Sequence, residues 1–494
     1  MRNHALLFIN GKEHRATGAE GFDTLSNYLR YTLCQTGTKI VCEEGDCGAC
    51  TVLVGRPDAT GRELEYRAIN SCIQIVGQLD GTSVITVEGL APSRELNAVQ
   101  EAMVTSHGAQ CGYCTPGFVV AMSALFETRD RLSEQQVRDG LTGNLCRCTG
   151  YEPIIKAALA VHGSKMTRAR DLYPSAPMLE AIGNHGRESL TIEHSGRTFL
   201  APVTVEEAID IRTARGPVTI LQGGTDLGVQ ANKRGLRPAI LMSLSGIRDL
   251  DQIRIGEETL SVGGTATLAA LEEAIRSHVG SAFSPAVGHL AELANILGIF
   301  GSPQIKNAGT LAGNIANGSP IADTLPFLLV MEARVELTGR SGMRVVPINS
   351  FYRGYKQLDL MADELITRII VPLPPSGSAE TLGLYKVSRR KDLDISSFTA
   401  AIRLETTAGT ITRASVALGG VGPVVMRMPA VEALLKGQSI TQDLFERAGQ
   451  LARHEIDPIS DVRGSRDFRL QLAENIFRKF YYERLATRQE LREA

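Results

Sequence analysis

Cys42-Glu-Glu-Gly-Asp-Cys47-Gly-Ala-Cys50 is a cysteine-rich motif near the start of the chain, and Cys72 adds a fourth thiol after 21 further residues. All nine cysteines of the chain lie between positions 34 and 148. Stable disulfides are rare in reducing compartments, where clustered cysteines indicate metal binding or redox chemistry. The N-terminal part therefore contains a local thiolate site.

The spacing C-x4-C-x2-C with a distant fourth cysteine is typical of plant-type 2Fe-2S sites. Gly45 and Gly48 fit this interpretation, because a loop that presents three sulfurs to one small cluster needs tight turns and backbone amides that face the sulfides. A zinc site is the alternative, and it more often shows two short Cys-x2-Cys pairs. The spacing therefore favours iron and sulfide over zinc.

A second group of four cysteines consists of Cys111-Gly-Tyr-Cys114 and Cys146-Arg-Cys148. This pattern by itself fits zinc about as well as an iron-sulfur cluster. Helix-start signals surround it and predict ligands in loops between helices: Asn97 with Gln100, Pro116, Ser133 with Gln136, and Pro153. The ninth cysteine, Cys34, is predicted to be an ordinary buried thiol.

Composition narrows the class of protein. The 494 residues hold 52 Lys and Arg against 54 Asp and Glu, a formal net charge of -2, which argues against a nucleic-acid binder. Hydrophobic residues make up 43% and charged residues 21%, which is ordinary globular usage. No uncharged apolar run of about 18 residues and no signal-peptide pattern occurs, so we expect a cytoplasmic, soluble protein without a membrane partner.

Hydrophobic patterns divide the chain into several domains. Short alternating runs with one helical stretch predict a small α+β domain over residues 1–87, and helical patterns follow over 88–163. Residues 164–190 hold prolines and charges without a long periodic run, which predicts a linker. Strands alternate with helices over 191–376, and strands followed by helices fill 383–490. The expected fold class is α+β multidomain.

Two glycine-rich segments could bind phosphate. The segment Leu221-Gln222-Gly223-Gly224-Thr225-Asp226 follows a predicted strand, and the segment 307–323 contains Asn307-Ala-Gly-Thr-Leu-Ala-Gly-Asn314. Neither G-x-G-x-x-G nor the Walker sequence occurs in the chain, so a dinucleotide site would have to be built differently. Glycines let backbone amides approach a phosphate, but the same residues also form tight turns. Both interpretations stay open on pattern alone.

Taken together, five motifs in this order resemble the small, electron-transferring subunits of xanthine dehydrogenases in the molybdenum hydroxylase family. The motifs are Cys42 to Cys50, Gln110-Cys-Gly-Tyr-Cys-Thr-Pro-Gly117, Cys146-Arg-Cys-Thr-Gly-Tyr151, Gly223-Gly-Thr-Asp226 and Gly309-Thr-Leu-Ala-Gly-Asn314. The resemblance implies a ferredoxin-like β-grasp domain, a helical-bundle 2Fe-2S domain, an α+β FAD-binding domain of two subdomains and an α+β C-terminal domain.

The resemblance also implies the site residues. One 2Fe-2S cluster would be held by Cys42, Cys47, Cys50 and Cys72, and the other, nearer the molybdenum, by Cys111, Cys114, Cys146 and Cys148. Gln110 and Cys148 would face the molybdopterin of a partner subunit. The segment 388–394 would be a charged loop beside the flavin. The FAD contacts would be Ile220, Leu221, Gln222, Gly223, Gly224, Thr225, Asp226, Phe300, Thr310, Gly313, Asn314, Asp323, Ile366 and Lys386.

The implied function is electron transfer, with no catalytic residue on this chain. Electrons from hypoxanthine or xanthine oxidation at a partner's molybdenum cofactor would pass through two 2Fe-2S clusters to FAD and then to NAD+. The partner would be a molybdenum-binding large subunit in an α2β2 heterotetramer. Two alternatives stay open: a subunit of another molybdenum hydroxylase, acting on an aldehyde or N-heterocycle with a different acceptor, and a zinc-stabilised module without a redox role.

Overall fold

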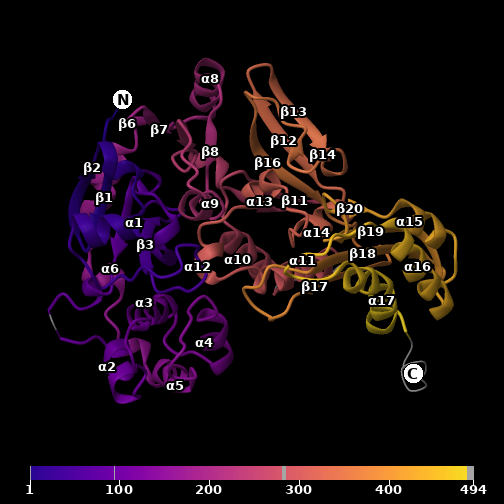
Figure 1. Cartoon of the computed structure of the whole chain (residues 1–494), viewed down its shortest axis with the longest axis horizontal. Helices are drawn as coiled ribbons and strands as arrows, with labels where there is room; N and C mark the ends of the chain where they lie inside the picture. Colours follow the sequence, from indigo (N-terminus) through magenta and orange to yellow (C-terminus); the bar gives the residue numbers. More distant parts are fainter. Residues whose placement is uncertain (1, 94, 281–284, 487–494) are drawn as a thin grey trace. The chain divides into compact units, whose positions relative to one another are not determined.

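The computed structural model describes residues 2–93, 95–280 and 285–486. It divides into two compact units, which are described separately: Met1–Arg248 with Gly301–Gly309, and Asp249–Phe300 with Thr310–Ala494. Figure 1 labels the helices and strands of both units. Within the described ranges, no helix combines the length and apolar character needed to cross a membrane.

The first unit begins with a five-stranded sheet in the order β2-β1-β5-β3-β4. Strands β1 and β5 pair in parallel, whereas the other neighbours are antiparallel. All five residues of the inner strand β1 are buried, and the short helical turns α1 (Leu25–Asn27) and η2 (Tyr28–Thr32) supply Leu25 and Leu29 to the same core. The strands are β1 (Ala5–Ile9), β2 (Lys12–Ala16), β3 (Thr51–Pro57), β4 (Leu64–Asn70) and β5 (Thr82–Ile85).

Helices follow the sheet. The predicted capping boxes are present, because Asn97 accepts from the Gln100 N–H and Ser133 from the Gln136 N–H. The central helix α3 buries eight of its twelve residues, and six of them belong to the hydrophobic core of this domain. The helices are α2 (Ala98–Thr105), α3 (Thr115–Phe126), α4 (Glu134–Gly140) and α5 (Glu152–Ala160).

The stretch 164–190 differs from the sequence expectation. It forms helices α6 (Ala169–Leu172) and α7 (Ser175–His185), although no helix was predicted there. Met178 and Ile182 of α7 are buried in the same core as α3. Leu179 and Ala181 pack partly buried against the same core, so one short apolar face stabilises this helix.

A second sheet of the first unit has the order β6-β7-β9-β8 and shares a hydrophobic core with β1. Strand β8 leads directly into the glycine-rich segment and then into helix α9. The elements are β6 (Leu190–His194), β7 (Arg197–Ala201), α8 (Val205–Arg215), β8 (Thr219–Leu221), α9 (Leu227–Arg234), β9 (Ile240–Ser243) and α12 (Pro303–Lys306).

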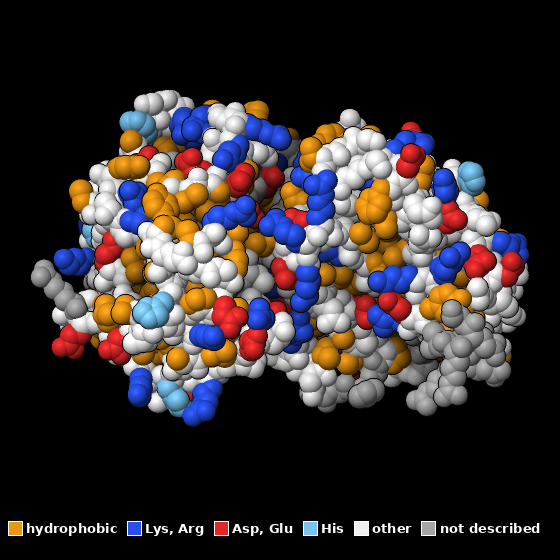
Figure 2. Space-filling view, turned by 60° about the horizontal axis from the view of Figure 1, so that its bottom comes forward, with side chains coloured by type: hydrophobic (Ala, Val, Ile, Leu, Met, Phe, Trp, Pro, Cys, Tyr) orange, Lys and Arg blue, Asp and Glu red, His pale blue; other side chains and the backbone are white. Residues whose placement is uncertain are grey.

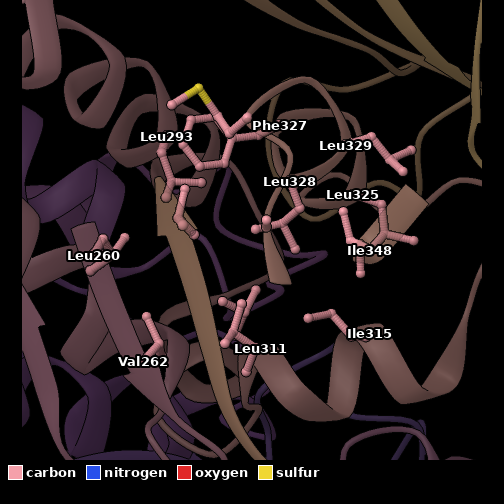
Figure 3. Packing of buried hydrophobic residues seen from close by; sticks show 14 of the residues in the cluster. Leu260, Val262, Leu293, Leu311, Ile315, Leu325, Phe327, Leu328, Leu329 and Ile348 are labelled. Carbon is pink, nitrogen blue, oxygen red and sulfur yellow. The ribbon is translucent and has the colours of Figure 1, made fainter. Parts of the chain in front are cut away.

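The second unit contains a five-stranded antiparallel sheet in the order β10-β11-β16-β12-β13. Figure 3 shows Leu260 and Val262 of this sheet with Leu293, Leu311 and Leu328 from helices around it. The elements are β10 (Ile253–Ile255), β11 (Thr259–Gly263), α10 (Leu268–Val279), α11 (Pro285–Gly298), α13 (Leu311–Asn317), α14 (Leu325–Val330), β12 (Arg334–Gly339), β13 (Gly342–Pro347), β14 (Tyr352–Gly354), β15 (Gln357–Leu358) and β16 (Leu365–Pro372).

The C-terminal part of the second unit is a four-stranded sheet in chain order with helices packed on it. The elements are β17 (Glu380–Val387), β18 (Phe398–Thr407), β19 (Thr410–Gly419), β20 (Met426–Arg427), α15 (Pro429–Leu435), α16 (Gln442–Glu455) and α17 (Arg466–Arg484). The expected α+β multidomain fold is confirmed. Figure 2 shows Lys and Arg beside Asp and Glu side chains on one face, in keeping with the near-zero net charge.

Leu328 tests the core shown in Figure 3. Its side chain is 1% exposed. We expect Leu328→Ala to lower the free energy of unfolding by about 2–5 kcal/mol, because it leaves a cavity in a close-packed core. Urea denaturation would measure this change. Met343→Ala is the control, since Met343 is 61% exposed and its truncation should change stability by less than about 0.5 kcal/mol.

His289 on α11 is a buried imidazole in the second unit. It is 3% exposed, and neither ring nitrogen has a hydrogen-bond partner among the described residues. Its Nδ1 lies 3.9 Å from Glu380 Oε2, which accepts a 2.7 Å hydrogen bond from Arg403 Nε. Burial lowers the pKa of His289 from 6.5 to about 4, and Glu380 offsets only part of this effect. The folded state therefore holds a neutral imidazole.

This lowered pKa predicts a loss of stability in acid. Between pH 6.5 and about 4 the unfolded chain binds a proton that folded His289 does not, so the free energy of unfolding falls as the pH falls. The contribution approaches about 3 kcal/mol at the acid end. We expect His289→Leu to flatten the stability profile in this range, measured by denaturation at several pH values. An unchanged slope would contradict the prediction, and exposed His454→Leu is the control.

Candidate functional site

The first four predicted thiols meet in the first unit. Cys42, Cys47 and Cys50 lie on the loop that precedes β3, and Cys72 lies on the short helical turn η3 (Ser71–Ile73) after β4. Thiol contacts join Cys42 to Cys47 and Cys72, and Cys72 to Cys50. Three of the four are buried, and Cys42 is half-buried. The pairing of β3 with β4 therefore brings the distant Cys72 to the loop.

These contacts separate the four thiols into donors and acceptors. Hydrogen bonds from the thiols of Cys47 and Cys72 hold the pKa of Cys42 far below its usual range, and the contact with Cys72 lowers the pKa of Cys50. The pKa values of Cys47 and Cys72 are raised, first by contact with Cys42 and then by burial and other thiols. Cys42 and Cys50 thus favour the thiolate, the form in which cysteine binds metal, whereas the raised pKa values of Cys47 and Cys72 favour the thiol.

Gly48 shows why the loop needs glycine. Its φ is +67°, and a Cβ there would lie 2.1 Å from the Gly143 carbonyl oxygen. Gly45 also has a positive φ, of +75°, and its carbonyl accepts a 2.8 Å hydrogen bond from Asn70 Nδ2. Left-handed backbone at both positions lets one short segment present three sulfurs.

The second set of thiols also comes together in the first unit. Cys148 Sγ lies 3.5 Å from Cys111 Sγ, and Cys146 is in thiol contact with Cys114. Cys114 is the N-cap residue just before α3, and Cys146 and Cys148 precede α5, so the ligands lie in loops between helices as predicted. Cys111 and Cys148 are exposed, as is the neighbouring Gln110.

The second set shows the same alternation of pKa shifts. A hydrogen bond from the Tyr113 N–H and the contact with Cys148 lower the pKa of Cys111. Burial opposes a low pKa at Cys146, but hydrogen bonds from Thr149, whose Oγ1 is 3.1 Å from the sulfur, outweigh it. Burial and the contact with Cys146 raise the pKa of Cys114 to about 12. The contact with Cys111 also raises the pKa of Cys148. Cys111 and Cys146 therefore favour the thiolate, whereas Cys114 and Cys148 favour the thiol.

The two thiol sets are joined directly. The Leu145 N–H, next to Cys146, donates a 2.9 Å hydrogen bond to the Cys47 carbonyl. Asn144 Nδ2 donates to the Gly48 carbonyl at 3.1 Å, and Gln304 Nε2 donates to Asn144 Oδ1 at 2.9 Å. Leu145, next to Cys146 of the second set, thus contacts Cys47 of the first set.

Cys34 corrects a prediction. It is exposed, whereas the sequence suggested a buried thiol. Cys34 follows the η2 turn with a φ of +55°, where the chain changes direction. Burial of one thiol depends on its tertiary neighbours, so residue type alone was a poor guide.

Both thiol sets fit a 2Fe-2S cluster by the chemistry of their donors. Each set supplies four cysteine sulfurs, the ligand set that such clusters take. Across the described residues, no three His, Cys, Asp or Glu side chains are grouped to hold a single metal ion.

The predicted flavin residues of the first unit lie at the end of β8 and on the loop to α9. A Cβ at Gly223 would lie 2.5 Å from the Ala308 carbonyl oxygen, and Gly224 has a φ of +70°. Gln222 Oε1 is buried and has no hydrogen-bond partner among the described residues. Asp226 is exposed and accepts from the side chain of Gln230. A tight loop with an unpartnered buried acceptor fits a polar ligand such as FAD.

The remaining predicted flavin residues lie in the second unit. Thr310 caps α13 by accepting from the Gly313 N–H at 3.0 Å, and Asn314 Oδ1 accepts from Thr324 Oγ1 at 2.6 Å. Phe300 follows α11 and packs partly buried against the core, and Ile366 is buried on β16.

Asp323 and Lys386 form a buried ion pair. Lys386 Nζ lies 2.6 Å from Asp323 Oδ2, and their side chains are 2% and 7% exposed. Ser396 Oγ donates to the other carboxylate oxygen at 2.5 Å. The structure therefore brings two of the predicted flavin residues into direct contact. Such a pair is costly to break, because either charge alone would stay buried.

The charged segment 388–394 is held in place by its own contacts. Arg390 pairs with Asp394 at 2.7 Å, and Arg389 Nη2 donates to the Val462 carbonyl at 2.6 Å. Hydrogen bonding to Arg390 holds the pKa of Asp394 below its usual range.

Four family models match the chain in sequence. They are a 2Fe-2S iron-sulfur cluster binding domain at residues 7–76, a [2Fe-2S] binding domain at 86–159, a FAD binding domain in molybdopterin dehydrogenase at 193–374, and a CO dehydrogenase flavoprotein C-terminal domain at 383–484. Both thiol sets fall within the first two matches. These domains support a 2Fe-2S/FAD subunit of the molybdenum hydroxylase class.

Curated relatives agree with this class. A xanthine dehydrogenase of Drosophila subobscura is 29% identical over 90% of this chain and 36% of its own length. A xanthine dehydrogenase of Emericella nidulans is 28% identical over 97% of this chain and 38% of its own length. Aldehyde oxidase 2 of Rattus norvegicus is 29% identical over 97% and 39%. The chain thus spans less than two-fifths of the length of these relatives.

Solved structures resemble part of the chain. Quinoline 2-oxidoreductase from Pseudomonas putida 86 aligns with a TM-score of 0.51 and 26% identity, and carbon monoxide dehydrogenase from Hydrogenophaga pseudoflava with 0.52 and 27%. Each alignment covers 57% of this chain and 94% of the matched chain. The matched domains are thus two 2Fe-2S domains, a FAD-binding domain and a flavoprotein C-terminal domain.

Cys47→Ser tests the first thiol set. We expect the purified chain to lose two of four irons and the absorbance of one cluster, because serine supplies no thiolate. Iron analysis and visible spectroscopy would measure the loss. Cys34→Ser is the matched control, since Cys34 is exposed and lies outside both sets. Retention of four irons by Cys47→Ser would refute the assignment.

Proposed function

We propose that this chain is the electron-transfer subunit of a xanthine dehydrogenase. Electrons from hypoxanthine or xanthine oxidation at the molybdenum cofactor of a partner subunit would leave through this chain to NAD+. The observation that carries the proposal is the hydrogen bond from Leu145 to Cys47, which joins two four-thiol sets in a chain that also matches FAD domains. Xanthine dehydrogenases among the similar proteins support the choice of substrate.

The proposed cofactors are two 2Fe-2S clusters and FAD. A 2Fe-2S cluster exchanges single electrons, whereas FAD exchanges electrons singly or in pairs, so this set can connect one-electron transfer to hydride transfer. One cluster would be held by Cys42, Cys47, Cys50 and Cys72, and the other by Cys111, Cys114, Cys146 and Cys148. FAD would contact residues 220–226 in the first unit and, in the second, Phe300, Thr310, Gly313, Asn314, Asp323, Ile366 and Lys386.

This chain's residues would bind and orient the cofactors. Main-chain hydrogen bonds fix the spacing of the thiol loops, and hydrogen bonds to the sulfurs tune cluster potentials. The exposed pair Cys111 and Cys148 supports a partner's approach to the second set, with Gln110 beside it. We propose that this partner is a molybdenum-binding large subunit, in an α2β2 assembly.

A second candidate is a subunit of another molybdenum hydroxylase. Aldehyde oxidase 2 resembles the chain about as closely as the xanthine dehydrogenases do, and quinoline 2-oxidoreductase resembles 57% of it. Turnover of the holoenzyme with xanthine, an aldehyde and quinoline, each with NAD+ or oxygen as acceptor, separates the candidates. Xanthine with NAD+ as the preferred pair supports the first proposal, and an aldehyde or quinoline with oxygen supports the second. Xanthine with oxygen would keep the proposed substrate and overturn NAD+ as the acceptor.

A visible spectrum tests the redox role itself. We expect the anaerobically purified chain to be coloured and to bleach with dithionite, because iron-sulfur and flavin bands both decrease on reduction. Acid should release flavin. A colourless chain that contains zinc would overturn the redox role and support a zinc-stabilised module.

Cys146→Ser tests the order of transfer. In the holoenzyme we expect xanthine to reduce the flavin at close to the background rate, because the second thiol set is proposed to lie nearer the molybdenum. NADH should still reduce the flavin normally. Stopped-flow spectroscopy at the flavin band measures both rates, and normal xanthine-driven reduction in Cys146→Ser would show that the proposed order is wrong.

A further inference from the structure

Gln74 and Gln78 are buried amides between the first thiol set and the proposed flavin loop. They follow Cys72 by two and six residues, on and beside the turn η4 (Val76–Leu79). Their exposures are only 2% and 3%. Both side chains reach residues more than 140 positions further along the chain, in the same unit. Neither belongs to the motifs that indicated FAD.

Their amides hold two consecutive carbonyls of the flavin loop. Gln78 Nε2 donates to the Gln222 carbonyl at 2.7 Å, and Gln74 Nε2 donates to the Gly223 carbonyl at 2.8 Å. The C=O and N–H of a trans peptide point in opposite directions. The N–H groups of Gly223 and Gly224 therefore point away from the two glutamines.

These N–H groups have no hydrogen-bond partner in the described residues. Within the part of the chain that the structure describes, no hydrogen bond uses the main-chain N–H groups of residues 223–226. Consecutive free amides of this kind form a cradle for phosphate oxygens. Gln222 Oε1, buried and also without a partner among these residues, lies on the same loop.

The glutamines are themselves held firmly. Val76 and Leu79, on the same turn, share a core with Leu221, the last residue before the loop. Beyond the loop, Asn232 Nδ2 of α9 donates to the carbonyls of Glu43 and Cys72 at 2.9 and 2.8 Å. The flavin loop is thus fixed on both sides by the domain that carries the first thiol set.

We propose that Gln74 and Gln78 are positioning residues that aim the amides of residues 223–226 at the pyrophosphate of FAD. The inference rests on the proposed FAD site and deepens it, because it assigns part of that site to residues of the iron-sulfur domain. The side-chain amides of Gln74 and Gln78, together with the loop's own glycines, set the conformation of the flavin loop.

Gln74→Met and Gln78→Met remove the donors and keep similar side-chain length. We expect each to raise the FAD dissociation constant of the deflavinated chain about tenfold, as for the loss of one buried hydrogen bond. Fluorescence titration measures this constant. Riboflavin, which has no phosphate, should bind to the variants as it binds to the unaltered chain. Iron content should stay unchanged.

Gln304→Met is the matched control. Gln304 is 1% exposed and its amide donates to Asn144 and Thr51 instead of the flavin loop. Three outcomes would overturn the inference and leave the proposed function in place. The control could lose as much FAD affinity as the variants, the variants could lose as much riboflavin affinity as FAD affinity, or both variants could keep their FAD affinity. An unaltered chain that binds no FAD would overturn both.

Discussion

The carbonyl oxygen of Gly48 is the point on which the arrangement of both thiol sets depends. It accepts from the Thr51 N–H at 3.1 Å, from Thr51 Oγ1 at 2.6 Å and from Asn144 Nδ2 at 3.1 Å. A Cβ at Gly117 would lie 2.2 Å from the same oxygen, so α3 approaches this closely only because that residue is glycine. One peptide group therefore fixes the first loop, the segment before Cys146 and the start of the helix after Cys114.

Buried charge organises the second unit in a comparable way. Asp323 with Lys386, and Glu380 with Arg403, are ion pairs whose side chains are at most 11% exposed. Buried pairs add little net stability over apolar packing, but they penalise any arrangement that separates them. Asp323 and Lys386 are both proposed flavin contacts, and each neutralises the charge of the other. The pair is therefore a rigid polar element, and neither group is a free charge. His289 stays neutral beside the other pair.

Local signals explain what could be predicted. The Asn97 and Ser133 capping boxes are confirmed, because a cap and its partner lie three residues apart. The position of ligands in loops between helices followed from the same signals. Helix α7 was missed because only Met178 and Ile182 are buried, and Cys34 was placed wrongly because its exposure depends on residues far away in sequence. Nothing in the sequence around Gln74 and Gln78 indicated their role.

The sequence alone determined the two cysteine groups, their loop positions and the α+β multidomain fold, since ligand spacing, caps and hydrophobic period depend on residues only a few positions apart. The tertiary structure decided which groups meet. Gln74 contacts a carbonyl 149 positions away, and Lys386 an aspartate 63 positions away. A hydrogen bond or ion pair over such a separation forms only after sheets and helices pack, because its geometry is set by the backbone of both partners.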